Sequence, residues 1–217
     1  MEQREEPFSL RIPAAEFVVG AVAARQFPQD DRAEIAFVGR SNVGKSSLLN
    51  RLLNRRNLAR VSRTPGRTRE INFFQVGEKW SFVDLPGYGY ASVGQVQRSV
   101  WDQLLGSYFA QRRNLRAVVL LLDLRRGLTE LDQELLRHLD QYGIPALPVA
   151  TKVDKLKSNE RREALRQLAL VLPQASHYLL LPAVTVSALN GEGMPGLWQR
   201  LQTLLADHLS AGDPLSP

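Results

Sequence analysis

The chain has 217 residues and a formal net charge of +6, which arises from 28 Lys and Arg against 22 Asp and Glu. This length suits one α/β domain with extensions. The chain has no Cys, which excludes a disulfide framework and a cysteine-ligated metal site. The charged start at residues 1–6 is followed by no apolar signal-peptide core, and the apolar runs are too short to span a bilayer, so we expect a cytoplasmic protein without stable membrane insertion.

Residues 1–30 contain three prolines and one apolar patch, and we interpret them as an N-terminal extension that adds an edge strand or a short helix. We then expect strands over 34–39, 71–76, 80–84, 117–123, 146–151 and 183–187, and helices over 45–53, 96–112, 129–142, 159–172 and 194–209. This alternation predicts an α/β fold with a doubly wound, mostly parallel six-stranded sheet, one antiparallel strand and helices on both faces. The predicted domain covers residues 31–209, and residues 210–217 form an unstructured tail.

A phosphate-binding loop is predicted between the first strand and the first helix. The candidate residues are Gly39, Arg40, Ser41, Asn42, Val43, Gly44, Lys45, Ser46 and Ser47. Glycines allow the backbone N–H groups to point inward at phosphate oxygens, and the helix N-terminus adds partial positive charge. Lys45 is positioned to reach the β- and γ-phosphates, and the Ser46 hydroxyl to hold Mg²⁺. The alternative is an ordinary glycine-containing turn between a strand and a helix.

A second phosphate element follows the hairpin. It consists of Asp84, Leu85, Pro86 and Gly87. In such an element Asp84 contacts Mg²⁺ through water, and the Gly87 amide lies where a γ-phosphate oxygen would be. The alternative is a strand-ending turn, because Asp, Pro and Gly all favour turns.

Two later segments predict a binding site for a guanine base. They are Thr151, Lys152, Val153 and Asp154, and then Val186, Ser187 and Ala188. The Asp154 carboxylate can accept hydrogen bonds from guanine N1–H and from the N2 amine, whereas adenine would leave it unpaired. The methylene stem of Lys152 can cover the base, and a backbone N–H after the last strand can meet guanine O6. The alternative for the first segment is a Lys–Asp pair on a solvated turn.

These motifs, in this order, resemble those of the Era-like P-loop GTPases, and more closely those of the EngB family (also called YihA or YsxC) of ribosome-biogenesis GTP-binding proteins. The similar segments are residues 39–50, 64–68, 71–74, 84–91, 122–125 and 151–155. The resemblance implies a Mg²⁺-dependent GTPase that binds GTP and GDP and acts in assembly of the large ribosomal subunit. The family is also linked to cell division and septation, which we interpret as an indirect effect.

The resemblance also places the two switch segments. The first contains Gly66, Arg67, Thr68, Arg69 and Glu70, and Thr68 rather than Thr64 is matched to the Mg²⁺ ion. The second covers residues 87–95. We expect Lys45, Thr68, Gly87 and Asn42 to act on the transferred phosphate.

Hydrolysis is expected to be slow without help. Tyr88 follows Gly87 where Ras-like GTPases carry a water-orienting glutamine, and tyrosine lacks the amide geometry. In related GTPases an asparagine at the position of Asn42 helps to hold K⁺ beside the phosphates. Asn42 is therefore a candidate K⁺ ligand here; the alternative is that it only stabilises the loop.

Seven arginines lie between Arg51 and Arg69, a stretch without Asp or Glu. We expect this segment to contact ribosomal RNA phosphates; the alternative is a solvated basic loop. Two other functions remain open. One is an ATP-dependent kinase or ATPase, and the other is a GTP-dependent switch that acts directly on a septation or membrane-surface partner. A monomer is the expected oligomeric state.

Overall fold

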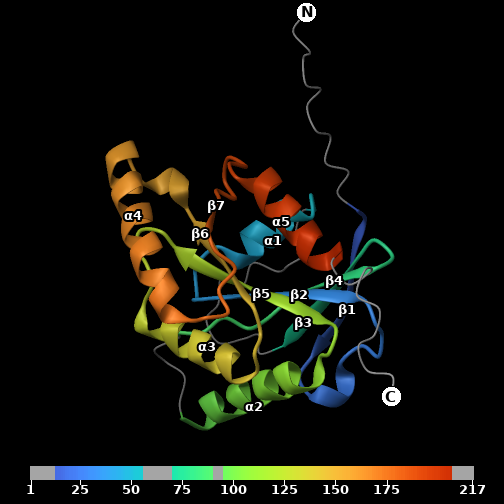
Figure 1. The fold of residues 1–217 in the computed structure, drawn as a ribbon. Helices are drawn as coiled ribbons and strands as arrows, with labels where there is room; N and C mark the ends of the chain where they lie inside the picture. The colour runs from blue at the N-terminus through green and yellow to red at the C-terminus, as the bar shows by residue number, and fades with distance from the viewer. Residues whose placement is uncertain (1–12, 56–69, 90–94, 207–217) are drawn as a thin grey trace, which may run out of the picture.

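Parallel strands form the centre of the sheet in this computed structural model, which describes residues 13–55, 70–89 and 95–206 (Figure 1). The parallel strands are β2 (Ala33–Gly39), β4 (Trp80–Asp84), β5 (Leu115–Asp123), β6 (Ala146–Thr151) and β7 (Val184–Thr185). Across the sheet of the described residues the order is β1-β3-β4-β2-β5-β6-β7. β3 (Ile71–Val76) runs opposite to both of its neighbours. The expected mostly parallel sheet with one antiparallel strand is therefore confirmed.

The sheet has seven strands among the described residues, and the expected number of six was wrong. The additional strand is β1 (Ala15–Ala21), which belongs to the predicted N-terminal extension and pairs antiparallel with β3, from Ala15 opposite Val76 to Ala21 opposite Ile71. It is followed by a short 3₁₀ helix, η1 (Ala24–Gln26). The sequence alone did not distinguish a strand from a helix here, because some apolar residues of an edge strand are exposed to solvent. Phe17, for example, has an exposed fraction of 53%.

Helices cover both faces of the sheet (Figure 1). α1 (Lys45–Leu52) and α5 (Met194–Ala206) pack on one face, and α2 (Gln95–Gln111), α3 (Glu130–Gln141) and α4 (Ser158–Ala175) pack on the other. Residues 117–122 of β5 alternate between these two apolar layers, and every one of them is buried. A central parallel strand reads as a continuous apolar run for this reason.

The other predicted elements agree with the structure within a few residues. The helix that was expected to end at residue 172 continues to Ala175, past Pro173, and β7 is shorter than the expected strand. Tyr108, Phe109 and Trp198 are buried in the two apolar layers. The predicted tail and the last predicted helical residues lie outside the described part, and the domain boundaries remain predictions. No helix in the described ranges is long and apolar enough to cross a membrane.

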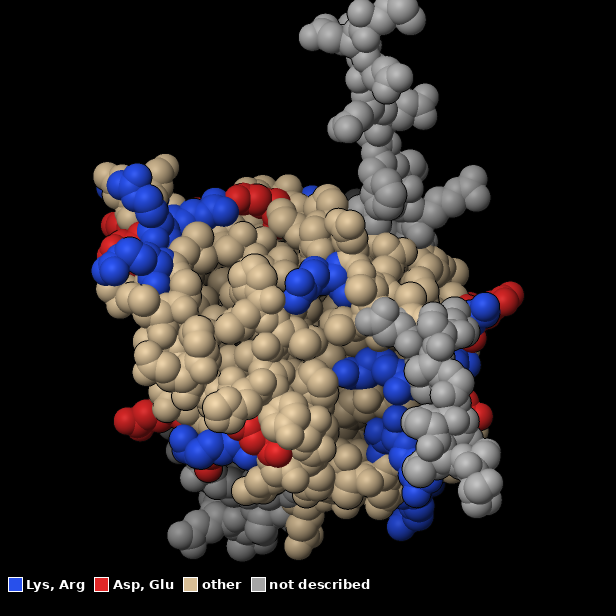
Figure 2. Space-filling model, in the orientation of Figure 1, with Lys and Arg blue, Asp and Glu red and all other residues tan. Residues whose placement is uncertain are grey.

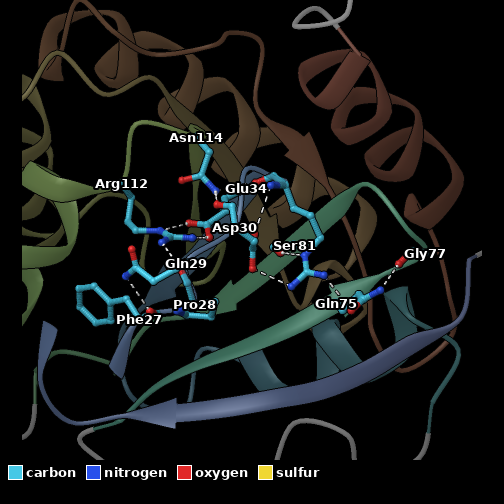
Figure 3. Close-up of polar contacts among 11 residues, drawn as sticks. Phe27, Pro28, Gln29, Asp30, Glu34, Gln75, Gly77, Ser81, Arg112 and Asn114 are labelled. Carbon is cyan, nitrogen blue, oxygen red and sulfur yellow. Dashed lines mark hydrogen bonds and ion pairs between the residues drawn. The ribbon is translucent and has the colours of Figure 1, made fainter. Parts of the chain in front are cut away.

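A buried polar cluster fixes the opening residues of β2 (Figure 3). The Glu34 side chain is fully buried, and its carboxylate forms an ion pair with Arg112, which directly follows α2. The Tyr108 hydroxyl donates to Glu34 Oε2 at 3.0 Å, and Arg112 Nη1 donates to the Pro28 carbonyl oxygen at 2.6 Å. Asn114 Nδ2 donates to the Arg32 carbonyl oxygen at 2.6 Å. These contacts join the segment before β2 to the end of α2.

Removing the cation from this cluster should destabilise the protein strongly. In Arg112→Met the Glu34 carboxylate stays buried without its counter-ion, and we expect unfolding to become easier by about 3–5 kcal/mol. Urea denaturation followed by circular dichroism measures the change. The matched control is Arg166→Met, which removes an exposed Arg–Glu pair on α4 and should leave the urea midpoint unchanged. Equal midpoints for the two variants would contradict the structural role of the cluster.

Candidate nucleotide-binding site

The loops that carry the predicted motifs meet at the carboxyl-terminal edge of the parallel strands. The backbone N–H of Ser41 donates to the carbonyl oxygen of Tyr88 at 3.0 Å, which joins the loop after β2 to the loop after β4. The Thr151 hydroxyl lies 2.9 Å from the Val43 carbonyl oxygen and 3.1 Å from that of Leu122. The ends of β5 and β6 are thereby connected to the same loop. In doubly wound sheets this edge is where ligands bind.

The loop between β2 and α1 has the backbone of a phosphate cradle. Asn42 and Gly44 both have left-handed conformations, with φ of 63° and 103°, and α1 begins directly afterwards at Lys45. Gly44 is the N-cap of α1 and has no side chain that could cap the first turn. The N–H groups of this first turn therefore face the loop. Gly87 lies close by: a Cβ added there would be 3.1 Å from the Gly39 carbonyl oxygen. A side chain at this position would force the two loops to move apart slightly, so glycine suits their close approach.

Two opposite charges lie at the predicted phosphate end of the site. The Lys45 ammonium group forms an ion pair with Asp84 Oδ1, and both side chains are largely buried. Ser46 follows Lys45 at the start of α1, so its hydroxyl is on the same short segment. This arrangement supplies one cation for phosphate oxygens and two hard oxygen donors, which is the donor chemistry that Mg²⁺ prefers.

The predicted purine end of the site is built from the loops after β6 and after β7. η2 (Val153–Lys155) contains Asp154, whose Oδ1 accepts a hydrogen bond from the Ser187 hydroxyl at 2.6 Å. Ser187 is fully buried, and its oxygen in turn accepts from the backbone N–H groups of Leu189 at 3.2 Å and Asn190 at 3.3 Å. The Ser187 hydrogen bond lowers the pKa of Asp154 below its ordinary value. Asp154 is therefore held in one orientation as an ionised acceptor.

The structure locates the other predicted site residues as follows. Arg40, Val43, Leu85, Pro86 and Ala188 lie in the loops just described, and Val186 is buried beside Ala150, to whose carbonyl oxygen its N–H donates at 2.9 Å. Glu70 is exposed just before β3. Gly66, Arg67, Thr68 and Arg69 fall outside the described residues, as does most of the second switch segment, so their predicted contacts stay predictions.

Tyr88 has a partner that the sequence analysis did not identify. Its ring is buried, and its hydroxyl donates to Asp132 Oδ1 on α3 at 2.5 Å. Burial and the adjacent carboxylate raise the pKa of Tyr88 well above its ordinary value, so the hydroxyl keeps its proton. Asp132 Oδ2 accepts from the N–H and the hydroxyl of Thr129 at 2.7 and 2.6 Å. The sequence Thr129-x-x-Asp132 signals this helix cap, but nothing in it signals Tyr88.

The Tyr88 hydroxyl should contribute measurably to stability. In Tyr88→Phe the ring stays in place while one oxygen of the buried Asp132 loses its donor, so we expect a loss of about 1–3 kcal/mol in the free energy of unfolding. Thermal and urea denaturation measure it. The control is Tyr178→Phe, because the Tyr178 side chain is half exposed and its replacement should change nothing. A Tyr88→Phe variant as stable as the control would show that the buried hydrogen bond is unimportant.

Comparison with known proteins supports the interpretation of this edge. A protein-family model described as "50S ribosome-binding GTPase" matches residues 34–152, and one described as "Elongation factor Tu GTP binding domain" matches residues 109–207. A protein of Desulfitobacterium hafniense named "Probable GTP-binding protein EngB" is 43% identical over 91% of this chain and 96% of its own length. A protein of the same name from a Geobacter species is 46% identical over 89% of each chain.

Solved structures show the same fold. The crystal structure of a probable GTP-binding protein EngB has a TM-score of 0.63 and 26% identity, over 81% of this chain and all of the other. The structure of Era in complex with MgGDPNP and nucleotides 1506–1542 of 16S ribosomal RNA has a TM-score of 0.57 and 24% identity, over 85% of this chain and 59% of the other. Together with the four motifs at one sheet edge, these similarities show that the chain belongs to the EngB family of GTP-binding proteins and is a GTPase.

Proposed function

We propose that this GTPase is a nucleotide-dependent switch in assembly of the large ribosomal subunit. The description "50S ribosome-binding GTPase" of the matching family model supports a ribosomal particle as the partner. The net charge of +6 is consistent with an RNA surface as the binding site. In this proposal the protein is cytoplasmic and monomeric, and any effect on cell division or septation follows indirectly from a shortage of ribosomes.

The proposed RNA contact is supported by two exposed arginines at the end of α1 without an acidic partner among the described residues. Arg51 and Arg55 are exposed, and neither forms an ion pair with a carboxylate in the described ranges. Arg51 lies against the backbone of Gly191, where an added Cβ would be 2.6 Å from its Nη2. These cations lead into the basic segment at residues 56–69 and are free to contact phosphates.

The arginines on α4 are less available. On the face drawn in Figure 2, Lys and Arg side chains gather over the N-terminal part of α4, with Asp and Glu among them. Arg161 pairs with Glu192 at 2.5 Å, and Arg166 pairs with Glu163 at 2.8 Å. An arginine already neutralised by a carboxylate gains less from a phosphate, so we place the RNA contact at the end of α1 and not on α4.

The roles of the site residues form part of the proposal. The Lys45 ammonium group and the backbone N–H groups of residues 44–47 bind the phosphates, and Gly87 contacts the γ-phosphate through its amide. The Ser46 hydroxyl, Thr68 and, through water, Asp84 would hold Mg²⁺, and the ion would neutralise phosphate charge. Asp84 and Lys45, which pair with each other in this structure, are the groups that would serve the ion and the phosphates, respectively.

The conformation of Tyr88 supports slow intrinsic hydrolysis. Its hydroxyl points to Asp132 on α3, so it is not directed at a water molecule beside the phosphates. We therefore assign Tyr88 a role in positioning the loop, and we retain Asn42 as a candidate K⁺ ligand. A bound cation there would add positive charge where negative charge develops during phosphoryl transfer.

The second candidate partner is a septation or membrane-surface protein that recognises the same GTP-dependent conformations. The nucleotide site would be identical in the two cases. The unpaired arginines at the end of α1 favour a polyanionic partner, and for this reason the ribosomal particle is our preferred one.

Co-sedimentation with large-subunit particles tests the proposal. We expect more protein in the particle fraction with GTP than with GDP, and a steep loss of binding between about 50 and 200 mM salt, because each phosphate contact releases counterions. Arg51→Ala/Arg55→Ala should reduce both the binding and its salt dependence. The control Arg166→Ala removes one positive charge from α4 and should bind as the wild type does.

Binding that is equal with GTP and GDP, or that does not respond to salt, would reject the ribosomal proposal. The same particles allow GTP turnover to be compared in KCl and in NaCl. Faster turnover in KCl is the result expected if a K⁺ ion acts at Asn42, and equal rates would remove K⁺ from the proposal.

A further inference from the structure

The carboxylate of Asp123, at the last position of β5, holds two cations at the purine end of the site. Asp123 Oδ2 lies 2.9 Å from Lys152 Nζ and 2.6 Å from Arg125 Nη2. Oδ1 accepts from Arg125 Nε at 2.8 Å and from the Arg125 backbone N–H at 3.2 Å. The Arg125 contact is therefore bidentate, which fixes the plane of the carboxylate as well as its position.

Lys152 connects this carboxylate to the phosphate-binding loop. Its backbone has a left-handed conformation, with φ of 60°, and its Nζ donates to the Asn42 carbonyl oxygen at 2.5 Å. Its Cε is 4.0 Å from the position of a Cβ added to Gly44, so the methylene stem extends along the loop. The ammonium group thus lies between an oxygen at the end of β5 and an oxygen of the loop after β2.

The environment of Asp123 favours a permanent negative charge. The side chain is only 9% exposed. Burial by itself raises the pKa of Asp123, but the hydrogen bonds from Arg125 and Lys152 outweigh this effect and lower the pKa far below its ordinary value. Because Arg125 is itself 43% exposed, it can screen the carboxylate from water without being buried. The result is a fixed anion aimed at the Lys152 ammonium group.

We propose that Asp123 and Arg125 are positioning residues that hold the stem of Lys152 over the guanine base and connect the base-binding loop to the phosphate-binding loop. The inference depends on the proposed nucleotide site, in which Lys152 covers the base and Asp154 reads it. A flexible lysine has three rotatable donors and many rotamers, and it loses conformational entropy when it is ordered over a base. An anion that fixes it beforehand reduces this cost on binding.

A double-mutant cycle tests the inference. The variants are Asp123→Asn, Lys152→Met and the double variant, each titrated with fluorescent GDP in the presence of Mg²⁺. In the wild-type background, Asp123→Asn should weaken GDP binding about tenfold. In the Lys152→Met background the same change should cost nothing further, because the group on which Asp123 acts has been removed. Equal losses in both backgrounds, or no loss in either, would overturn the proposal.

Two further variants separate positioning from general destabilisation. Arg125→Ala changes an exposed side chain and should weaken GDP binding a few-fold while the unfolding midpoint of the nucleotide-free protein stays the same. Glu163→Gln breaks an exposed Arg–carboxylate pair on α4 and should change neither quantity. A parallel titration of Asp154→Asn tests the site itself, because unchanged GDP binding in that variant would refute the proposed site. If instead the effects of Asp123→Asn and Lys152→Met on GDP binding are additive, only the positioning role is refuted.

Discussion

The parallel strands β2, β4, β5 and β6 all end at the same edge of the sheet, and the arrangement of the candidate site depends on this constraint. Since these strands are parallel, the loops after them leave the sheet on the same side and lie next to one another. The Thr151 hydroxyl, for example, donates to the Val43 carbonyl oxygen after β2 and lies close to the Leu122 carbonyl oxygen near the end of β5, so it joins these loops. Residues far apart in the chain thereby lie together at one edge, where we place the phosphates and the purine of the nucleotide.

Two buried hydrogen-bonded contacts join the sheet to the helices on one of its faces. The Glu34–Arg112 ion pair fixes the start of β2 to the end of α2. The Tyr88–Asp132 hydrogen bond fixes the loop after β4 to the start of α3. Because α2 follows the predicted second switch in the chain, its far end is anchored while its near end is next to the segment expected to respond to the γ-phosphate.

Local sequence was sufficient to locate the candidate segments that lie within a single loop at the ends of their strands. Two such segments directly follow apolar strands: the glycines with Lys45 after β2, and Thr151–Asp154 after β6. Their positions can be predicted from the residues next to them in the sequence. The contacts that orient these residues could not be predicted in the same way. Ser187 and Asp154 are 33 residues apart, Tyr88 and Asp132 are 44 apart, and Arg112 and Glu34 are 78 apart. Their pairing is a consequence of the packed sheet, and β1 escaped clear prediction because an exposed edge strand has a weak apolar pattern.

The most direct test of the account is whether the Asp154 carboxylate selects the purine. Fluorescent GDP, ADP and xanthosine diphosphate would be titrated into the wild-type protein and into Asp154→Asn with Mg²⁺ present. We expect the wild type to prefer GDP to ADP by at least about 100-fold. We expect Asp154→Asn to prefer the xanthosine nucleotide, because an amide N–H can donate to the carbonyl that replaces the guanine amine. Equal affinity of the wild type for GDP and ADP would contradict it.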